Sequence, residues 1–291
     1  MPEIVDLFVQ NNGVKYINLP TNGLKPHRIY EVVDHCLAAN PGLELHVNVA
    51  LDGLLETHDF LRGVPGNFEK VFETTRMLRK LKPRFGYRLK VHINTVITRN
   101  NLDDLLPLAE LVLAGNMVDG HYFNLIRGNA KDPGLKMLER NKLRRIYPRI
   151  AEIQWKYADN MIADRNPIMR WMKKAIYVGT LSFHHRTQYA NLAQPKKWSM
   201  PCTAGETSAV IDFDGRIRAC ELRPPIGNLR DFDMNLKVFW ETPARANEPK
   251  QIACDQCWCS HVCFIHDSLR YSAKAMLTEI PKNFLLRKIW K

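Results

Sequence analysis

Cysteine spacing is the feature that most limits how this chain can fold. Six of its seven cysteines lie within the 62 residues from Cys202 to Cys263, and the seventh is Cys36. The closing segment, Cys254-Asp-Gln-Cys257-Trp-Cys259-Ser-His-Val-Cys263, carries four of them. Thiolates at such short spacing converge on one centre when the chain turns tightly, and soft thiolate ligands select zinc or iron–sulfur clusters. The spacing therefore predicts that distant parts of this segment fold back around a metal.

Disulfides are the alternative use of these thiols. They are typical of secreted domains, and the N-terminus, Met1-Pro-Glu-Ile-Val-Asp, has neither the basic nor the apolar region of a signal peptide. We therefore expect a cytoplasmic protein whose cysteines bind metal. Spacing alone does not decide between zinc and iron–sulfur. It also leaves open which four of the six cysteines are ligands: Cys202, Cys220, Cys254, Cys257, Cys259 and Cys263.

The charge of the chain is concentrated in its middle. The net charge is +12, and residues 136–200 hold 14 basic and 4 acidic side chains, whereas residues 1–135 are balanced. Such a segment suits an anionic peptide, a membrane surface or nucleic acid, or it is a solvated helical face. No nucleic-acid-binding motif accompanies the charge, so nucleic acid is not an expected partner. No apolar run approaches the length of a membrane span, so we expect a soluble protein.

The first 126 residues alternate between strand and helix patterns. Such alternation predicts a parallel sheet with helices packed against it. Turn residues from Pro20 to Gly23 are predicted to end the first strand, and Asn101 to cap the third helix of the alternation. The predicted strands are 15–19, 43–51, 87–97 and 118–126, and the predicted helices are 1–12, one that begins at Pro26, 67–82 and 101–114.

The remaining residues are predicted to be mainly helical, with one hairpin. Residues 136–166 have a helical stripe that Pro148 is expected to break or kink. The turn Asp212-Phe-Asp-Gly215 lies between alternating strands and predicts a hairpin that brings Cys220 back toward Cys202. A short helix from Val238 and a basic amphipathic tail over residues 269–290 complete the chain.

Polar residues follow each of the four predicted strands. The carboxyl ends of parallel strands meet at one edge of the sheet, where sites in such folds lie. The pattern therefore predicts a binding site at that edge, formed by Thr21-Asn22-Gly23, Asp52-Gly53, Asn94-Thr95 with Thr98, and Asn124 with Arg127-Gly128. The adjacent His184 and His185 are a weak signal and are typical of ordinary surface or hydrogen-bonded histidines.

In this order, the motifs resemble those of radical S-adenosylmethionine (radical SAM) proteins with a C-terminal auxiliary iron–sulfur domain of the SPASM or twitch kind. The strand-end motifs resemble the family's third to sixth barrel strands, and include the pattern Asp52-Gly53, His58-Asp59, Arg62-Gly63 after the fourth. The opening of the auxiliary domain is resembled by three motifs in turn: Cys202-Thr-Ala-Gly205, Gly215 before Cys220, and Gly227-Asn-Leu. Its closing cysteines are resembled by Cys254-x2-Cys257-x5-Cys263.

The resemblance implies an α/β fold. It would comprise a partial radical SAM TIM-type barrel with parallel strands, followed by a small Cys-rich α+β auxiliary-cluster domain. The expected ranges are 1–135 for the partial barrel, 136–197 for a basic helical linker, 198–270 for the auxiliary domain and 271–291 for a basic tail. The family's Cys-x3-Cys-x2-Cys motif is absent, and Asp267 stands where the full auxiliary pattern has a cysteine. We therefore expect one auxiliary cluster, in a chain that is either N-terminally truncated or a degenerate relative, and not competent alone.

The resemblance also implies a function, namely radical-based modification of a peptide or an anionic small molecule. S-adenosylmethionine and one [4Fe-4S] cluster would be cofactors, and flavodoxin or ferredoxin the reductant. Arg62 would bind the methionine carboxylate, or else pair with Asp59 or Glu56. The implied cofactor contacts are Thr21, Asn22, Asp52, Arg62 and Asn94, and the first four cluster ligands are Cys202, Cys220, Cys257 and Cys263, with Cys254 and Cys259 as rivals. The alternative is a zinc-binding or catalytically inactive module that binds peptide or nucleic acid.

Overall fold

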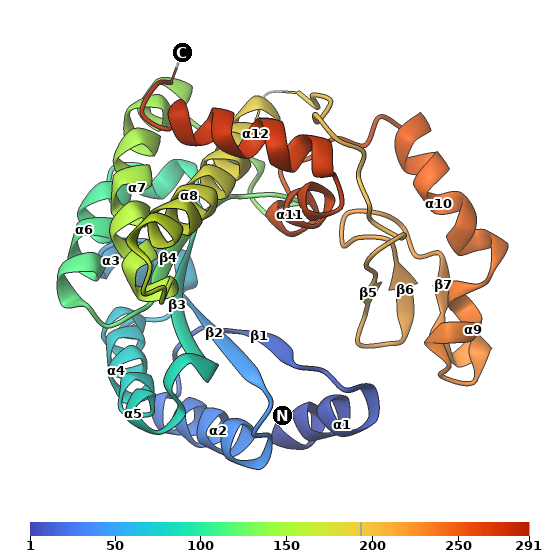
Figure 1. Cartoon of the computed structure of the whole chain (residues 1–291), viewed down its shortest axis with the longest axis horizontal. Helices are drawn as coiled ribbons and strands as arrows, with labels where there is room; N and C mark the ends of the chain where they lie inside the picture. Colours follow the sequence, from blue (N-terminus) through green and yellow to red (C-terminus); the bar gives the residue numbers. More distant parts are fainter. Residues whose placement is uncertain (193, 291) are drawn as a thin grey trace. The chain divides into compact units, whose positions relative to one another are not determined.

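The computed structural model describes residues 1–192 and 194–290, which divide into two compact units (Figure 1). The first unit comprises residues 1–126, 132–174 and those from 288 onward, and the second comprises 127–131 and 175–287. Helix α8 (Pro167–Ala190) continues across the division. The basic segment expected over 136–197 is therefore shared between the units.

The first unit is built on a parallel sheet of four strands in the order β1-β2-β3-β4 (Figure 1). This confirms the parallel arrangement predicted from the alternation of strands and helices. Its elements are α1 (Pro2–Asn12), β1 (Tyr16–Thr21), α2 (Pro26–Ala39), β2 (Glu44–Ala50), α3 (Leu55–Arg62), α4 (Asn67–Arg79), α5 (Lys82–Phe85), the 3-10 turn η1 (Gly86–Arg88), β3 (Leu89–Ile97), η2 (Arg99–Asn101), α6 (Leu105–Gly115), β4 (Gly120–Leu125), η3 (Pro133–Lys136) and α7 (Arg140–Met161).

The two faces of this sheet differ in composition because successive side chains of a strand point to opposite sides. One face is apolar and fully buried, as Leu45, Val47 and Val49 of β2 illustrate. Helices α2 and α4 pack on the sheet through residues such as Leu37 and Val71. Polar side chains line the other face, and most of them retain part of their exposure, although His92 is buried. The sheet therefore has one apolar and one polar face.

Three local predictions were wrong in detail. Strand β1 continues through Pro20, which is tolerated because β1 lies at the edge of the sheet. Asn101 does not cap α6; it forms a capping box with Thr98 around η2, and α6 begins only at Leu105. Pro148 lies inside α7, which continues to Met161, so the predicted break does not occur, and the alternative of a kink stays a prediction.

The second unit contains a small antiparallel sheet of order β5-β6-β7 and the helices that follow it. The predicted hairpin around Gly215 is confirmed. The elements are β5 (Val210–Ile211), β6 (Arg216–Arg218), β7 (Gly227–Asn228), η4 (Leu229–Phe232), α9 (Leu236–Trp240), α10 (Pro243–Cys254), α11 (Val262–Arg270) and α12 (Ala273–Leu285). None of the helices in the described residues is long and apolar enough to cross a membrane.

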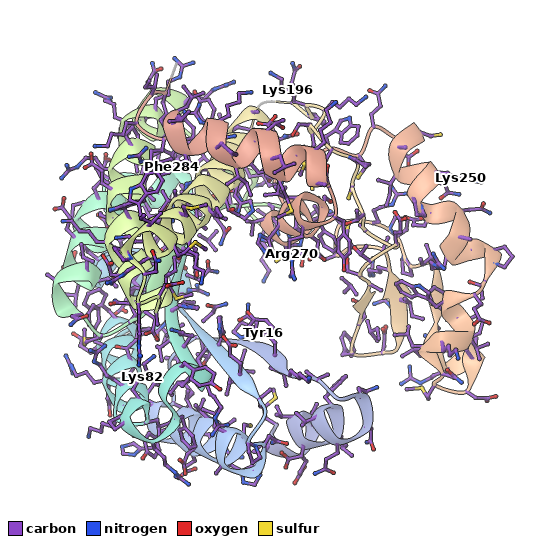
Figure 2. All side chains as sticks on the ribbon, viewed as in Figure 1. Tyr16, Lys82, Lys196, Lys250, Arg270 and Phe284 are labelled. Atoms are coloured by element: carbon purple, nitrogen blue, oxygen red, sulfur yellow. The ribbon has the colours of Figure 1, made fainter. Side chains whose placement is uncertain are left out.

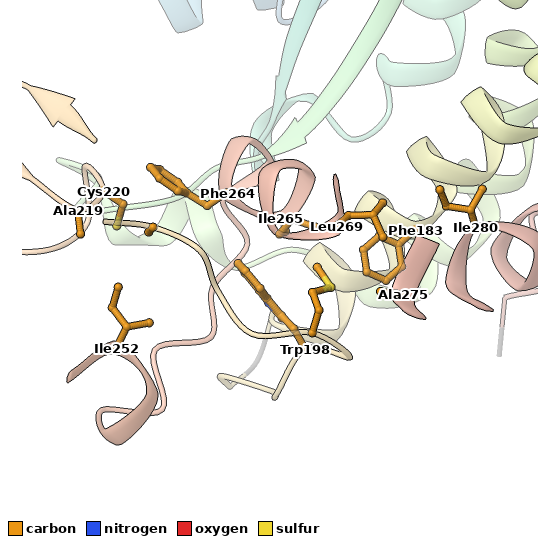
Figure 3. Close-up of a cluster of buried hydrophobic side chains, with 12 residues drawn as sticks. Phe183, Trp198, Ala219, Cys220, Ile252, Phe264, Ile265, Leu269, Ala275 and Ile280 are labelled. Atoms are coloured by element: carbon orange, nitrogen blue, oxygen red, sulfur yellow. The ribbon is translucent and has the colours of Figure 1, made fainter. Parts of the chain in front are cut away.

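The core of the second unit joins its helices to its cysteine-bearing segments. Phe183 of α8, Ile265 of α11 and Ile280 of α12 belong to one buried cluster that also includes Trp198 and Cys220 (Figure 3). Cys202, Cys257 and Cys259 pack against the same cluster. The apolar core therefore holds cysteines that are far apart in the sequence in one part of this unit.

Candidate cofactor-binding sites

Asp52 is the best-anchored of the predicted cofactor-binding residues. It lies just beyond β2, where its carboxylate accepts a hydrogen bond from the backbone N–H of Val96 at 2.8 Å and pairs with Arg62 at 2.6 Å. Its own N–H donates to Nδ1 of His58 at 3.0 Å, and its carbonyl accepts from Asn101 at 2.5 Å. Burial raises the pKa of Asp52, while Arg62 opposes that rise. Asp52 is therefore a fixed carboxylate at the carboxyl edge of the sheet.

Two buried nitrogen atoms beside Asp52 have no hydrogen-bond partner among residues 1–192 and 194–290, namely Nε of Arg62 and Nε2 of His58. Burial and the nearby Arg62 lower the pKa of His58 to about 4. His58 is thus neutral at pH 7, and since its Nδ1 accepts from Asp52, its Nε2 carries the proton. Both orphaned atoms are donors. Buried donors are normally satisfied, so this edge has unused capacity to bind an acceptor group.

Arg62 has a different partner from those expected. Asp59, one of the two carboxylates expected to pair with it, instead accepts the backbone N–H groups of Gly66 and Phe68 at 2.5 and 2.9 Å at the start of α4. The observed ion pair of Arg62 is with Asp52, on the preceding loop.

The other predicted cofactor contacts are not gathered around Asp52 in the same way. Thr21 and Asn22 accept from the backbone N–H groups of Gly23 and Leu24 at 3.3 and 3.2 Å, so both side chains close the local turn. Thr21 lies on the helix-covered face of β1, whereas Asn94 lies on the polar face of β3 and accepts from Asn124 at 2.6 Å. The structure brings Asp52 and Arg62 together and places Thr21 and Asn94 on opposite faces.

All seven cysteines are free thiols in the structure. Cys36 is buried on α2 in the first unit, whereas the other six cysteines belong to the second unit and are far from it in sequence. Cys254 and Cys263 are exposed, at the end of α10 and the start of α11. The disulfides considered from the sequence are therefore not formed.

Four of the remaining thiols form what we call the cysteine group, composed of Cys202, Cys220, Cys257 and Cys259. Burial raises the pKa of Cys202, Cys220 and Cys259, the last to about 12, and charges on other members of the group raise each pKa further. For Cys263, burial also raises the pKa, but the charges that act on it are those of Arg127, Glu221 and Asp267. The structure therefore associates Cys259, rather than Cys263, with the other three cysteines.

The cysteine group has the donor chemistry of a zinc or iron–sulfur site, but it is not closed around one ion. In the part of the chain that the structure describes, no three His, Cys, Asp or Glu side chains lie close enough together to hold a metal ion. A structural zinc needs its sulfur ligands at about 2.3 Å. Four thiols spread around a shared core do not meet that requirement as they stand.

Arg223 links the two segments that carry Cys220 and Cys257. Its backbone N–H closes a turn onto the carbonyl of Cys220 at 3.2 Å. Its guanidinium donates to the buried carboxylate of Glu248 and, at 3.0 Å, to Asp255, and it also hydrogen-bonds the side chain of Cys257. Arg223 is 9% and Glu248 2% exposed, so this is a buried ion pair. No motif in the sequence pointed to Arg223.

Glu221 and the buried histidines were also missed. Glu221 accepts from Arg127 at 2.7 Å and lies 3.0 Å from Nε2 of His261. His184 is buried on α8 and lies 3.4 Å from His266 of α11. The adjacent histidines at 184 and 185 are therefore both interior residues. Since each of these contacts joins segments far apart in the chain, only residue type, and no local spacing, could have suggested them.

Comparison with known proteins gives one informative relative. The chain is 35% identical over 139 residues to the AdoMet-dependent heme synthase of Methanosarcina barkeri (strain Fusaro / DSM 804). The match covers 45% of this chain and 36% of the length of that protein, so the chain spans about a third of its relative. No protein-family model matches the sequence. The similarity, together with the parallel α/β unit, supports a relationship to the radical SAM proteins.

Proposed function

We propose that this chain is a radical SAM-type protein that binds S-adenosylmethionine beside Asp52 and an iron–sulfur cluster through its cysteines. The observation that carries the proposal is the 35% identity over 139 residues to a protein named as an AdoMet-dependent heme synthase. The order of the strand-end motifs and of the cysteines along the chain supports the same assignment. The reaction class is radical-based modification of a peptide or small molecule, with flavodoxin or ferredoxin as reductant. The relative's name adds a tetrapyrrole to the candidate substrates.

Asp52 and Arg62 have the chemistry that the S-adenosylmethionine assignment needs. A buried carboxylate accepts hydrogen bonds from ribose hydroxyls, and a guanidinium binds a carboxylate in a bidentate way. The unpartnered Nε of Arg62 and Nε2 of His58 support the assignment, because the bound molecule would supply the missing acceptors. Thr21, Asn22 and Asn94 remain proposed contacts on the strength of the resemblance alone.

We further propose that the ligands of the cluster are Cys202, Cys220, Cys257 and Cys259. Charges on other members of the group help to raise the pKa of Cys202, Cys220 and Cys259, and all four side chains lie in or against one apolar core; both observations support this choice over a set that contains Cys263. A bound cluster would supply electron-transfer chemistry, and the apolar core around Trp198 would exclude water from it. The chain contains no Cys-x3-Cys-x2-Cys motif, so binding rather than turnover is the property to test first.

The decisive experiment is anaerobic reconstitution of the full chain with iron and sulfide, followed by metal analysis and electron paramagnetic resonance. About four irons per chain, with sulfide and a cluster signal after reduction, is the expected result. Stoichiometric zinc without iron would overturn the assignment and leave the zinc-binding alternative. In parallel, calorimetric titration with S-adenosylmethionine should give binding that Asp52→Asn weakens at least tenfold, with exposed Asp103→Asn as the matched control. Equal binding by both variants would remove Asp52 from the site.

A further inference from the structure

The second unit contains a pocket of about 320 Å³ that no residue proposed above as a cofactor or cluster contact lines. The lining residues come from 183–191 of α8 and its end, 196–199 of the segment that leads to Cys202, and 279–286 of α12 and its end. On each helix they recur at spacings of three and four, so one face of the helix lines the pocket. The volume is within the range of about 300–1,000 Å³ that is typical of small-molecule sites.

Direct packing of α8 against α12 holds the walls of this pocket in place. Gly179 of α8 lies against the backbone of α12, since a Cβ there would be 2.6 Å from the carbonyl oxygen of Ile280. Further along α8, Nη2 of Arg186 donates to the carbonyl of Leu286 at 2.6 Å. Phe183 lines the pocket and also belongs to the buried cluster of this unit (Figure 3). The pocket is therefore shaped by the packed core of the second unit.

The lining of the pocket is strongly basic. It contains four cations and one carboxylate, a net charge of +3, from Arg186, Lys196, Lys197, Lys282 and Glu279. The carboxyl ends of α8 and α12 also lie at the pocket, and each helix end carries a partial charge of about −0.5. Together these charges leave an excess of about +2 in the pocket. Such an excess favours an anion, and a dianion over a monoanion.

The cations of the pocket keep donors that the protein does not use. In the part of the chain that the structure describes, no group accepts a hydrogen bond from Nζ of Lys196 or of Lys197. Nζ of Lys282 lies 3.8 Å from Oε2 of Glu279, which is too far for a hydrogen bond. The same Oε2 accepts from Nδ2 of Asn283 at 3.2 Å. The pocket thus offers ammonium donors to a ligand, while its one carboxylate already has a partner.

We propose that this pocket binds a small phosphate monoester. A phosphate monoester carries a charge of about −1.5 to −2 at pH 7 and three strong acceptor oxygens, which match the excess charge and the ammonium donors of the pocket. A carboxylate brings a single charge and two oxygens. Inorganic phosphate alone would leave much of the volume to water, whereas an organic group would cover Phe183 and Trp198. The inference goes beyond the proposed function and does not rest on it.

Nuclear magnetic resonance of the full chain, titrated with phenyl phosphate, tests the proposal. The signal is the indole N–H of Trp198, a lining residue that donates to the carbonyl of Cys259 at 3.2 Å. Phenyl phosphate should give a saturable shift and bind about fivefold more tightly than inorganic phosphate, which lacks the apolar group, or benzoate, which lacks the second charge. Phenol, which is uncharged, should not bind.

Three variants locate the binding site. Lys196→Gln and Lys282→Gln should each weaken the binding of phenyl phosphate about threefold, because each removes one exposed cation. Lys250→Gln removes an exposed lysine of α10 and should leave binding unchanged. Figure 2 shows Lys196 beside α12 and Lys250 on α10, at separate places in the second unit.

Several results would overturn the proposal. They are the absence of a saturable shift with phenyl phosphate, and binding that Lys196→Gln and Lys282→Gln leave unchanged. Equal affinity for inorganic phosphate would assign the pocket to the free ion, and equal affinity for benzoate would assign it to carboxylates. Lys196 and Lys282 are exposed, so their substitution by glutamine keeps the fold and the test valid. The titration needs neither iron nor S-adenosylmethionine, so its failure is distinguishable from failure of the proposed function.

Discussion

The carboxylate of Asp52 and the guanidinium of Arg62 form an ion pair of 2.6 Å that fastens the end of α3 to the loop after β2. The Asp52 side chain is 9% exposed and that of Arg62 is 30% exposed. The pair therefore lies largely out of water, where an unpaired charge is costly.

Removing Arg62 alone should be more damaging than removing both partners. Arg62→Met leaves a buried carboxylate unpaired, and we expect a loss of about 2–3 kcal/mol in the free energy of unfolding. Adding Asp52→Asn should recover part of this loss, because no charge then remains buried. Urea unfolding of the two variants measures the difference. Arg84→Met removes the more exposed Arg84–Asp34 pair and should cost less than about 1 kcal/mol; equal losses for Arg62 and Arg84 would contradict the argument.

His121 should make the first unit sensitive to acid. It is fully buried on β4, its Nε2 lies 2.8 Å from Oγ1 of Thr95, and burial lowers its pKa to about 3 from an ordinary value of 6.5. Below pH 6.5 the unfolded chain therefore binds a proton that the folded chain does not. Stability is complete above pH 6.5 and should fall toward pH 3 by up to about 1.4 kcal/mol per pH unit from this group.

The pH dependence of unfolding for His121→Gln tests this assignment. Its stability should fall less steeply than that of the wild type between pH 6 and pH 4, since the other buried histidines contribute to both slopes alike. His27→Gln changes an exposed side chain and should keep the wild-type slope. Parallel curves for wild type and His121→Gln would show that this imidazole is not the group that resists protonation.

Cys259 and Cys263 should differ in their effect on metal binding. Cys259 belongs to the cysteine group, whereas the charges that act on Cys263 are those of Arg127, Glu221 and Asp267. After reconstitution, Cys259→Ser should lose most of its iron and Cys263→Ser should retain it, with Cys36→Ser as a control in the first unit. The reverse pattern would favour the set that the family resemblance implies. Iron and sulfide analysis of the purified variants is the measurement.

Gly179 should be intolerant of even a methyl group. A Cβ at this position of α8 would lie 2.6 Å from the carbonyl of Ile280 and 3.2 Å from Cβ of Phe284 on α12. Alanine is otherwise preferred in a helix by about 1 kcal/mol, but the overlap with backbone should outweigh this, and Gly179→Ala should lose about 1–3 kcal/mol. Gly42→Ala, where a Cβ meets nothing within 4 Å, should be near neutral. The measurement is the thermal unfolding of both variants, and a lower unfolding temperature for Gly42→Ala than for Gly179→Ala would refute the close contact.

The sequence by itself determined the parallel sheet and its approximate strands. Alternating buried residues such as Leu45, Val47 and Val49 indicate a strand with one apolar face. A helix between two consecutive strands returns the chain to the same end of the sheet, so the strands pair in parallel. The hairpin around Gly215 was equally local, because its turn and flanking alternation lie within a few residues of each other. Pro20 does not end its strand and Pro148 does not break its helix, because the effect of proline depends on the surroundings: an edge strand in one case, a packed long helix in the other.

Only the tertiary structure decided which side chains meet. Asp52 pairs with Arg62 and accepts hydrogen bonds from Val96 and Asn101. Arg223 pairs with Glu248 and Asp255. Cys259 belongs to the cysteine group. All of these contacts connect separate segments of the chain. The register of the four parallel strands, which hydrogen bonding between their backbones sets, decides which side chains of neighbouring strands lie next to each other. A sequence pattern records which face of an element is buried; the partner of each polar group is fixed only when the faces pack and their hydrogen bonds are satisfied.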